Sequence, residues 1–468
     1  MSINSTTAQL KISKIEITND AISARGGLTL FLHYLENTKV FELIEHHLSK
    51  MKGSMKGITT REFLIQFMSF IMDGSHTSIS YFDQLKTDDV HAALLETEPD
   101  RLASSHQIKR FFRRFVHTNK GKHLFREIIA ELFLWRLDIE RPKHIILGID
   151  TMVLDNNDAQ KREGVEYTYK NKNGFQPLHI TWGPFLADVI FRKGSAHSNH
   201  GNDFIESVSR IVYLIRKRYS KDIPIILVAD SGFLDQKAFK VFEKTLKINY
   251  VVTGKFYGDL WDTIKKIPKK TFNRYEHNGF WKYVELGWQY ASWDRMRRAV
   301  FTSLVADDNG QTKLDFMRIN SIIITNLGMD EKLNEQLQAA GIGHYTDIEQ
   351  VIRISHNRGR DELVHRSLKE LATKEQLPFK NFEMNSAHYY LQVITHIMFE
   401  SFKRDVSADV IPVTSYPNTF RRKLIDFAAK IVKHSGLITM KVREFIMKSL
   451  KLDELWQRCQ SPPQICVA

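Results

Sequence analysis

Two apolar runs that each reach an aspartate constrain the fold of this chain more than any other feature. Residues 144–151 (HIILGIDT) and 224–230 (PIILVAD) are almost continuously apolar until Asp150 and Asp230. Runs of this length without polar alternation are typical of strands buried on both faces, as in a sheet covered by helices. The sequence therefore predicts an α/β fold in which two central strands end in acidic side chains.

The order of the elements around these runs favours a ribonuclease H-like core. Further strands are predicted at 177–182, 186–193 and 250–255, and helices at 203–218 and 236–246. The order strand, strand, strand, helix, strand, helix, strand combines an antiparallel meander with parallel crossovers. In that fold the first and fourth strands are neighbours, so we expect Asp150 and Asp230 to lie together at their carboxyl ends.

A helix predicted to begin near residue 361 supplies a candidate third acid. An apolar stripe recurs at helical spacing, at Val364, Leu368 and Leu371. Polar residues crowd a neighbouring arc of the same helix, at Glu362, Arg366 and Lys369. Taken alone, this pattern is more typical of an ordinary salt-bridged helix than of a functional site.

The two strand-end aspartates give Glu362 a second interpretation. Carboxylates held side by side repel each other, and a divalent metal ion offsets that repulsion. Asp150, Asp230 and Glu362 are therefore a candidate catalytic site for two ions, Mg²⁺ or Mn²⁺, of the kind that promotes in-line displacement at phosphorus. The alternative for each aspartate is a helix N-cap, because both precede turns.

The chain divides into four predicted regions, with a change of composition at Arg141-Pro142. They are a helical region at 1–140, a catalytic core at 141–256 and 350–400, an inserted mainly β domain at 257–349, and a helical region at 401–468. In the last of these, Arg421, Arg422 and Lys423 are expected to be exposed on a helix that starts at Pro417.

The N-terminal region contains a basic amphipathic helix that we expect to bind DNA. Two capping boxes, at 59–62 and 104–107, precede apolar helices. The second helix, at 107–116, carries Lys109, Arg110, Arg113 and Arg114 on the face opposite its aromatic residues. Short capped helices that end in a basic one suggest a helix-turn-helix-like unit. The alternative is a solvated basic face on a helical bundle.

The composition agrees with a polyanionic partner. The chain of 468 residues has 67 Lys and Arg against 54 Asp and Glu, a net charge of +13. Its two cysteines form neither a zinc pattern nor a disulfide framework, and no run is long enough to cross a membrane. We therefore expect a cytoplasmic, nucleoid-associated protein without a membrane partner.

Three blocks of sequence resemble the DDE transposases of bacterial insertion sequences, group 1, in particular insertion-sequence family 1380. The first joins 148–151 (GIDT) to 167–177 (YTYKNKNGFQP) and 192–199 (RKGSAHSN), and the second is 228–233 (VADSGF). The third follows the family's signature of Tyr, two residues, Arg, three residues, Glu, six residues, Lys. Arg358, Glu362 and Lys369 match it, whereas Ser355 stands at the Tyr position.

The resemblance implies a cut-and-paste transposase that acts on double-stranded DNA, both terminal inverted repeats and target, as a homodimer or a larger synaptic complex. It assigns Asp150, Asp230 and Glu362 to the metal ions. Arg358 and Lys369 would contact phosphates near the scissile bond. We also expect Lys170 and Lys172 to bind the DNA backbone.

Two other functions remain open on the sequence. One is a DNA-binding protein of transposase descent that has lost catalysis, and the other is a structure-selective nuclease of the same fold. The presence of all three acids favours catalysis, because a protein without it has no need of mutually repelling carboxylates.

Overall fold

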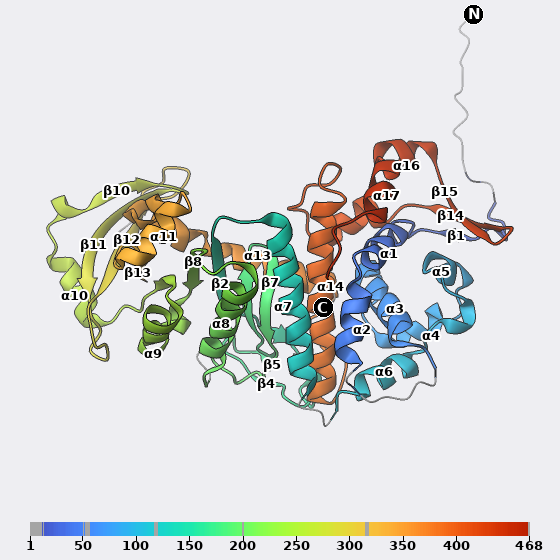
Figure 1. The fold of residues 1–468 in the computed structure, drawn as a ribbon, viewed down its shortest axis with the longest axis horizontal. Helices are drawn as coiled ribbons and strands as arrows, with labels where there is room; N and C mark the ends of the chain where they lie inside the picture. The colour runs from blue at the N-terminus through green and yellow to red at the C-terminus, as the bar shows by residue number, and fades with distance from the viewer. Residues whose placement is uncertain are drawn as a thin grey trace, which may run out of the picture.

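The computed structural model describes residues 12, 14–49, 51, 57–116, 120–198, 201–313 and 318–466, with only the backbone of residues 120, 360 and 361. A helical bundle lies at one end and a large sheet at the other, and the long helix α14 (Phe382–Asp405) stands between them (Figure 1). Among the described residues, no helix is both long and apolar enough to cross a bilayer.

The N-terminal bundle is helical, as predicted. Its α-helices are α1 (Gly27–Asn37), α2 (Val40–Leu48), α3 (Thr60–Asp73), α4 (Phe82–Leu85), α5 (Asp89–Leu94), α6 (Ser105–Arg113) and α7 (Lys120–Glu140). Both predicted capping boxes form, at the starts of α3 and α6. The aromatic side chains of α6 are buried and Lys109, Arg110 and Arg113 are exposed, which confirms its amphipathic pattern.

Nine strands form one mixed sheet in the order β10-β11-β12-β13-β9-β8-β2-β6-β7. Its strands are β2 (Ile145–Thr151), β6 (Leu178–Trp182), β7 (Phe185–Ile190), β8 (Ile225–Ala229), β9 (Asn249–Thr253), β10 (Asn273–Glu276), β11 (Phe280–Trp288), β12 (Arg297–Ala306) and β13 (Asn320–Thr325). The two parallel pairs are β2 with β8 and β8 with β9, and every other pair is antiparallel.

The alternation of side chains along β2 and β8 decides which helices the acids face. Odd-numbered residues such as Ile149 pack in one core with α8 (Asp203–Leu214) and α9 (Gln236–Lys240). Even-numbered residues such as Val228 pack on the other face with α11 (Glu331–Ala339) and α12 (Ile348–His356). Because successive side chains alternate, Asp150 belongs to the face of α12. Helix α13 (Arg360–Ala372) follows α12 directly and contacts β2.

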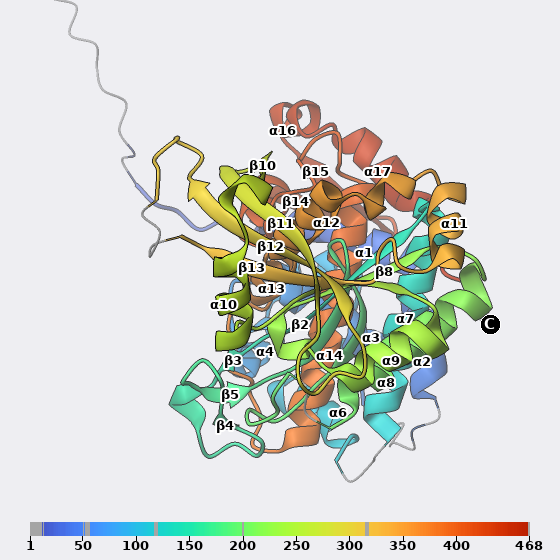
Figure 2. The same cartoon turned by 90° about the vertical axis from the view of Figure 1, so that its left-hand side faces the viewer.

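The segment predicted as an inserted β domain extends the same sheet. Strand β13 pairs with β9, so β10–β13 continue the sheet beyond the central strands. Viewed along the long axis, β11 and β12 cross in front of the molecule, with α10 (Gly258–Lys266) on one side and α11 on the other (Figure 2). The domain boundaries proposed from the sequence stay predictions.

The prediction of a wholly helical C-terminal region was wrong. Strands β14 (Ala429–His434) and β15 (Leu437–Val442) form a hairpin that pairs with β1 (Ile22–Ser23). Ser435 and Gly436 both have positive φ, as a tight hairpin turn requires. The helices here are α15 (Pro417–Phe420), α16 (Glu444–Ser449) and α17 (Leu452–Gln460).

Arg421 was also predicted incorrectly, because it is buried whereas Arg422 and Lys423 are exposed. Its guanidinium donates hydrogen bonds of 2.7–3.0 Å to four carbonyl oxygens at the ends of α3 and α13, those of Ile71, Met72, Glu370 and Leu371. A single side chain therefore donates to carbonyls at the C-terminal ends of two helices.

A small sheet of β3 (Leu154–Asp155), β4 (Glu166–Tyr167) and β5 (Asn173–Phe175) follows β2 in the chain. The backbone N–H of Asp155 donates to Glu375 Oε2 at 3.1 Å, just beyond the end of α13. The small sheet thus lies beside the helix that carries Glu362.

Candidate active site

Asp150 and Asp230 lie side by side at the carboxyl ends of adjacent parallel strands, as predicted. In the register of β2 and β8, Ile149 pairs with Ala229, so the two aspartates are the next residues in line. Neighbouring strands lie about 4.8 Å apart. Both carboxylates are partly buried, with 17% of the Asp150 side chain and 34% of the Asp230 side chain exposed.

Each aspartate uses one carboxylate oxygen on the nearby backbone. Asp230 Oδ1 accepts a hydrogen bond of 2.7 Å from the N–H of Gly232 and caps the 3₁₀ turn Ser231–Phe233. Asp150 Oδ1 accepts one of 2.7 Å from the N–H of Thr151. The capping interpretation is therefore correct for Asp230. It is compatible with a metal site, because capping occupies only one oxygen.

The second oxygen of each aspartate faces the start of α13. Arg358 Nη1 lies 3.8 Å from Asp230 Oδ2, and His365 Nδ1 lies 3.9 Å from Asp150 Oδ2. Glu362 lies between Arg358 and His365 in the chain, and its side chain is exposed. The start of α13 therefore lies next to both Asp150 and Asp230.

The other bases near Glu362 pair with different acids. Arg366 Nε lies 2.9 Å from Glu370, and Lys369 Nζ lies 2.8 Å from Glu375. Neither base is used to neutralise Glu362 in the manner of the ordinary salt-bridged helix. Within the described ranges, however, no three His, Cys, Asp or Glu side chains converge closely enough to hold a metal ion.

Two buried histidines beside Asp150 were missed in the sequence. His179 on β6 is the antiparallel partner of Asp150 in the register, and its ring centroid lies 5.0 Å from that of His365. Two features of the sequence could have indicated them. His179 stands inside an otherwise apolar strand, and His365 follows Glu362 by one helical turn. Burial, followed by nearby Lys369, Lys170 and Arg358, lowers the pKa of His365 to about 3. The imidazole beside Asp150 is therefore neutral at physiological pH.

Three of the predicted DNA-binding residues lie near the candidate site, because their charges contribute to the lowered pKa of His365. Lys170, Arg358 and Lys369 all lie close enough to act on His365. Lys172 instead pairs with Asp155 at 2.6 Å. The basic residues of α6 belong to the bundle, across α14 from the acids (Figure 1).

The loop before α8 reaches the second aspartate. A Cβ atom at Gly232 would lie 2.8 Å from Ser198 Oγ and 2.9 Å from Asp230 Oδ1. The block 192–198 and the block 228–233 therefore meet at Asp230, whereas Asn199 lies outside the described residues.

Comparison with known families shows to which family this chain belongs. The family model described as transposase DDE domain, group 1, matches residues 7–462. The chain belongs to this family. The resemblance noticed in the three sequence blocks is confirmed, and it extends over almost the whole chain.

A cryo-EM structure is among the solved structures similar to this transposase-family chain, whereas no curated protein matches it. This is the piggyBac transposase synaptic complex with hairpin DNA, at 13% sequence identity and a TM-score of 0.40. The match covers 95% of this chain and 86% of that chain. A similarity at this TM-score supports no inference about the residues of the site.

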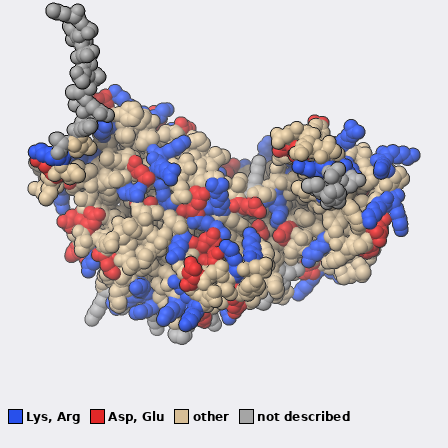
Figure 3. All heavy atoms as spheres, turned by 180° about the vertical axis from the view of Figure 1, so that it is seen from behind, with Lys and Arg blue, Asp and Glu red and all other residues tan. Residues whose placement is uncertain are grey.

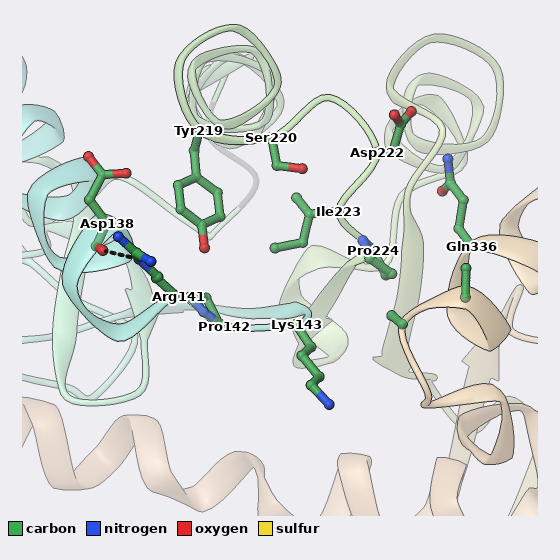
Figure 4. Close-up of a pocket in the computed structure, with 12 residues that line it drawn as sticks. Asp138, Arg141, Pro142, Lys143, Tyr219, Ser220, Asp222, Ile223, Pro224 and Gln336 are labelled. Carbon is green, nitrogen blue, oxygen red and sulfur yellow. Dashed lines mark hydrogen bonds between the residues drawn. The ribbon is translucent and has the colours of Figure 1, made fainter.

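Two cavities lie along the central strands. One of about 670 Å³ lies at the amino ends, where the backbone turns from α7 into β2, with Arg141 donating to the carbonyl of Asp138 (Figure 4). Another of about 350 Å³ lies between the sheet and α12, on the face of Asp150, and Arg358 and Gly148 line it. Neither lining includes Asp150 or Asp230, but Arg358, which lies against Asp230, borders the smaller cavity.

The two strand-end carboxylates are of the type that binds a divalent metal ion. Carboxylate oxygens are the ligands that Mg²⁺ prefers, and Asp150 and Asp230 both direct an oxygen toward α13. Seen from behind, the surface is hollowed between the main body and the smaller lobe that carries β10–β13, with Lys and Arg on both sides (Figure 3). A polyanion is therefore a suitable ligand for this surface.

Proposed function

We propose that this chain is a cut-and-paste DNA transposase whose catalytic residues are Asp150, Asp230 and Glu362. The observation that carries the proposal is the pair of adjacent strand-end aspartates, both facing the start of the helix that bears Glu362. Membership of the transposase family supplies the reaction class.

The strand order supports a ribonuclease H-like core for this reaction. In chain order β2, β6, β7, β8 and β9 are the first to fifth strands, and they lie side by side as 3-2-1-4-5. The first three form the antiparallel meander, and the fourth and fifth are parallel to the first. This is the arrangement that the sequence predicts for such a core.

The three acids would hold two Mg²⁺ or Mn²⁺ ions. When bound, the ions activate a water or a 3′-hydroxyl and stabilise the leaving oxygen. Glu362 needs to approach the two aspartates from its exposed position, and Arg358 now lies against Asp230. We propose that DNA draws Arg358 onto a phosphate while Glu362 turns toward the aspartates.

The basic residues would hold the DNA. Arg358, Lys369 and Lys170 lie near the acids, so they would contact phosphates around the cleaved bond, and Lys172 would extend that contact. Lys109, Arg110, Arg113 and Arg114 of α6 would bind the terminal repeat farther away. Double-stranded DNA would be the partner, and a homodimer or a larger synaptic complex would hold the two ends.

Cleavage of a labelled DNA fragment that carries the inverted repeat flanking the gene tests the proposal. We expect Mg²⁺-dependent nicking by the unaltered protein. Glu362→Gln should lower its rate by roughly a hundred- to a thousandfold, because the charge that stabilises the reacting centre is lost. Asp150→Asn and Asp230→Asn should behave alike.

A matched control is Glu331→Gln, which changes an exposed glutamate at the start of α11 and should cut at the unaltered rate. DNA binding by all four variants, measured by gel shift, should persist. Unimpaired cutting by Glu362→Gln would refute the assignment of Glu362, and binding without any cutting by the unaltered protein would favour a non-catalytic descendant.

A further inference from the structure

A buried line of three polar side chains ends at Asp150. Tyr389 on α14, His179 on β6 and His365 on α13 are at most 9% exposed, and they come from three elements that meet beside β2. The Tyr389 hydroxyl lies 2.8 Å from His179 Nε2, the two imidazole centroids lie 5.0 Å apart, and His365 Nδ1 faces Asp150 Oδ2 at 3.9 Å.

Two ring nitrogens in this line have no hydrogen-bond partner among the described residues. They are His179 Nδ1 and His365 Nε2. An unpaired polar atom in a buried place is costly, so each needs a partner. Two imidazoles joined by one N–H···N bond have centroids about 5 Å apart, which is the separation found here. A small rotation of either ring would let the two orphaned nitrogens satisfy each other.

The hydroxyl of Tyr389 determines which groups donate and which accept hydrogen bonds along this line. In such a line each ring accepts at one nitrogen and donates from the other, so each ring carries one N–H. A phenol that donates to His179 Nε2 leaves the proton of that ring on Nδ1, which can then donate to His365 Nε2. The proton of His365 is thereby placed on Nδ1, the nitrogen that faces Asp150.

We propose that Tyr389, His179 and His365 form a hydrogen-bond relay that orients Asp150 and fixes α13 against β2. His365 is the positioning residue, and the other two set its tautomer. The relay holds the second oxygen of Asp150 in place before any metal ion binds. It also sets the distance between α13, which carries Glu362, and the two aspartates. This inference rests on the proposed function for its consequence in catalysis, but the tautomers can be measured without it.

The structure provides a matched pair of variants on one helix. Tyr389→Phe removes the head of the relay, whereas Tyr390→Phe removes a neighbouring buried hydroxyl that bonds to the backbone of Val189 and Phe191 at 3.3 Å. Each variant loses one buried hydroxyl, so a purely structural effect should be similar in both. Only Tyr389→Phe should disturb His179 and His365.

Ring ¹⁵N spectra of the histidine-labelled protein give the direct test, with the His365 signals identified by their absence in His365→Gln. We expect His365 to carry its proton on Nδ1 in the unaltered protein and in Tyr390→Phe, and to lose this preference in Tyr389→Phe. A proton on Nε2 of His365 in the unaltered protein, or equal spectra in the two tyrosine variants, would overturn the relay.

The Mg²⁺ concentration for half-maximal cleavage gives the second readout. It should rise about tenfold in His365→Gln and Tyr389→Phe, with unchanged DNA binding, and stay unchanged in Tyr390→Phe. An equal rise in both tyrosine variants would contradict a positioning role. Because the spectra need neither DNA nor activity, a protein that shows the expected tautomers but never cuts would refute the proposed function and leave the relay standing.

Discussion

At the scale of single residues, the site depends on the different contacts that the two carboxylate oxygens of each aspartate make. One oxygen accepts a hydrogen bond from the backbone, which fixes the carboxylate, and the other faces α13. The turn after each strand therefore helps to hold the carboxylate in one orientation.

Gly232→Ala tests this arrangement at Asp230. The new methyl group would lie within 3.0 Å of Ser198 and of Asp230 Oδ1, which is closer than carbon atoms approach oxygen, so the carboxylate must shift. We expect cleavage to fall by about tenfold to a hundredfold, because small displacements of reacting groups are costly. Gel-based cleavage rates measure this effect.

Gly258→Ala is the control, because a Cβ atom there meets nothing within 4 Å and its φ is not positive. Adding Ser198→Gly to Gly232→Ala should restore part of the lost rate by making room for the methyl group. A Gly232→Ala protein as active as Gly258→Ala would show that the turn does not hold Asp230.

At the scale of elements, local signals predicted most of the central sheet and its acids. The runs at 144–151 and 224–230 are β2 and the stretch from β8 to Asp230, and both capping boxes form. These elements are encoded within a few residues, by apolar runs and by side chains that bond to their own backbone.

Features that depend on distant partners were not predictable in this way. The position of Arg421 depends on α3 and α13, which lie 349 and 51 positions away at Met72 and Glu370. The contact of His365 with Asp150 depends likewise on the packing of a helix on a strand. The hairpin at 429–442 had a local signal, the turn Ser435-Gly436, that was outweighed by helical spacing nearby.

Arg421→Ala should destabilise the protein by about 3 kcal/mol or more, because four helix-end carbonyls lose a charged donor in a buried place. Urea unfolding measures the change in the free energy of unfolding. Arg422→Ala, an exposed neighbour, should change it by less than about 0.5 kcal/mol. Equal values for both variants would mean that the two helix ends find other donors.

At the scale of the whole molecule, α14 joins the bundle to the sheet, and it is buried along almost its entire length. It carries His388, which packs between Phe67 and Phe112, and His396, which contacts Ser367 of α13 at 3.1 Å. Burial lowers the pKa of His388 to about 3 and that of His396 to about 4.

These histidines make the stability of the whole molecule dependent on pH. An unfolded histidine takes up a proton near pH 6.5, whereas the folded protein leaves His388 neutral down to about pH 3. Between these values the unfolded chain binds more protons, so the free energy of unfolding falls as the pH falls.

The unaltered protein should lose free energy of unfolding between pH 7 and pH 5, and His388→Leu should make this loss smaller by about 2 kcal/mol. Urea unfolding at the two pH values gives the difference. His434→Leu, which replaces an exposed histidine of β14, should leave the pH dependence unchanged. If both variants lose stability on acidification as the unaltered protein does, His388 is not held neutral in the fold.

The central claim is that Glu362 joins Asp150 and Asp230 in holding the catalytic metal ions, and exchange of the metal tests it most directly. A thiolate binds the hard ion Mg²⁺ poorly and softer transition-metal ions such as Mn²⁺ better. Glu362→Cys should fail to cleave the terminal repeat in Mg²⁺ and regain at least about a tenth of the unaltered rate in Mn²⁺. Glu331→Cys should cleave in both. Full cleavage by Glu362→Cys in Mg²⁺ would contradict the assignment.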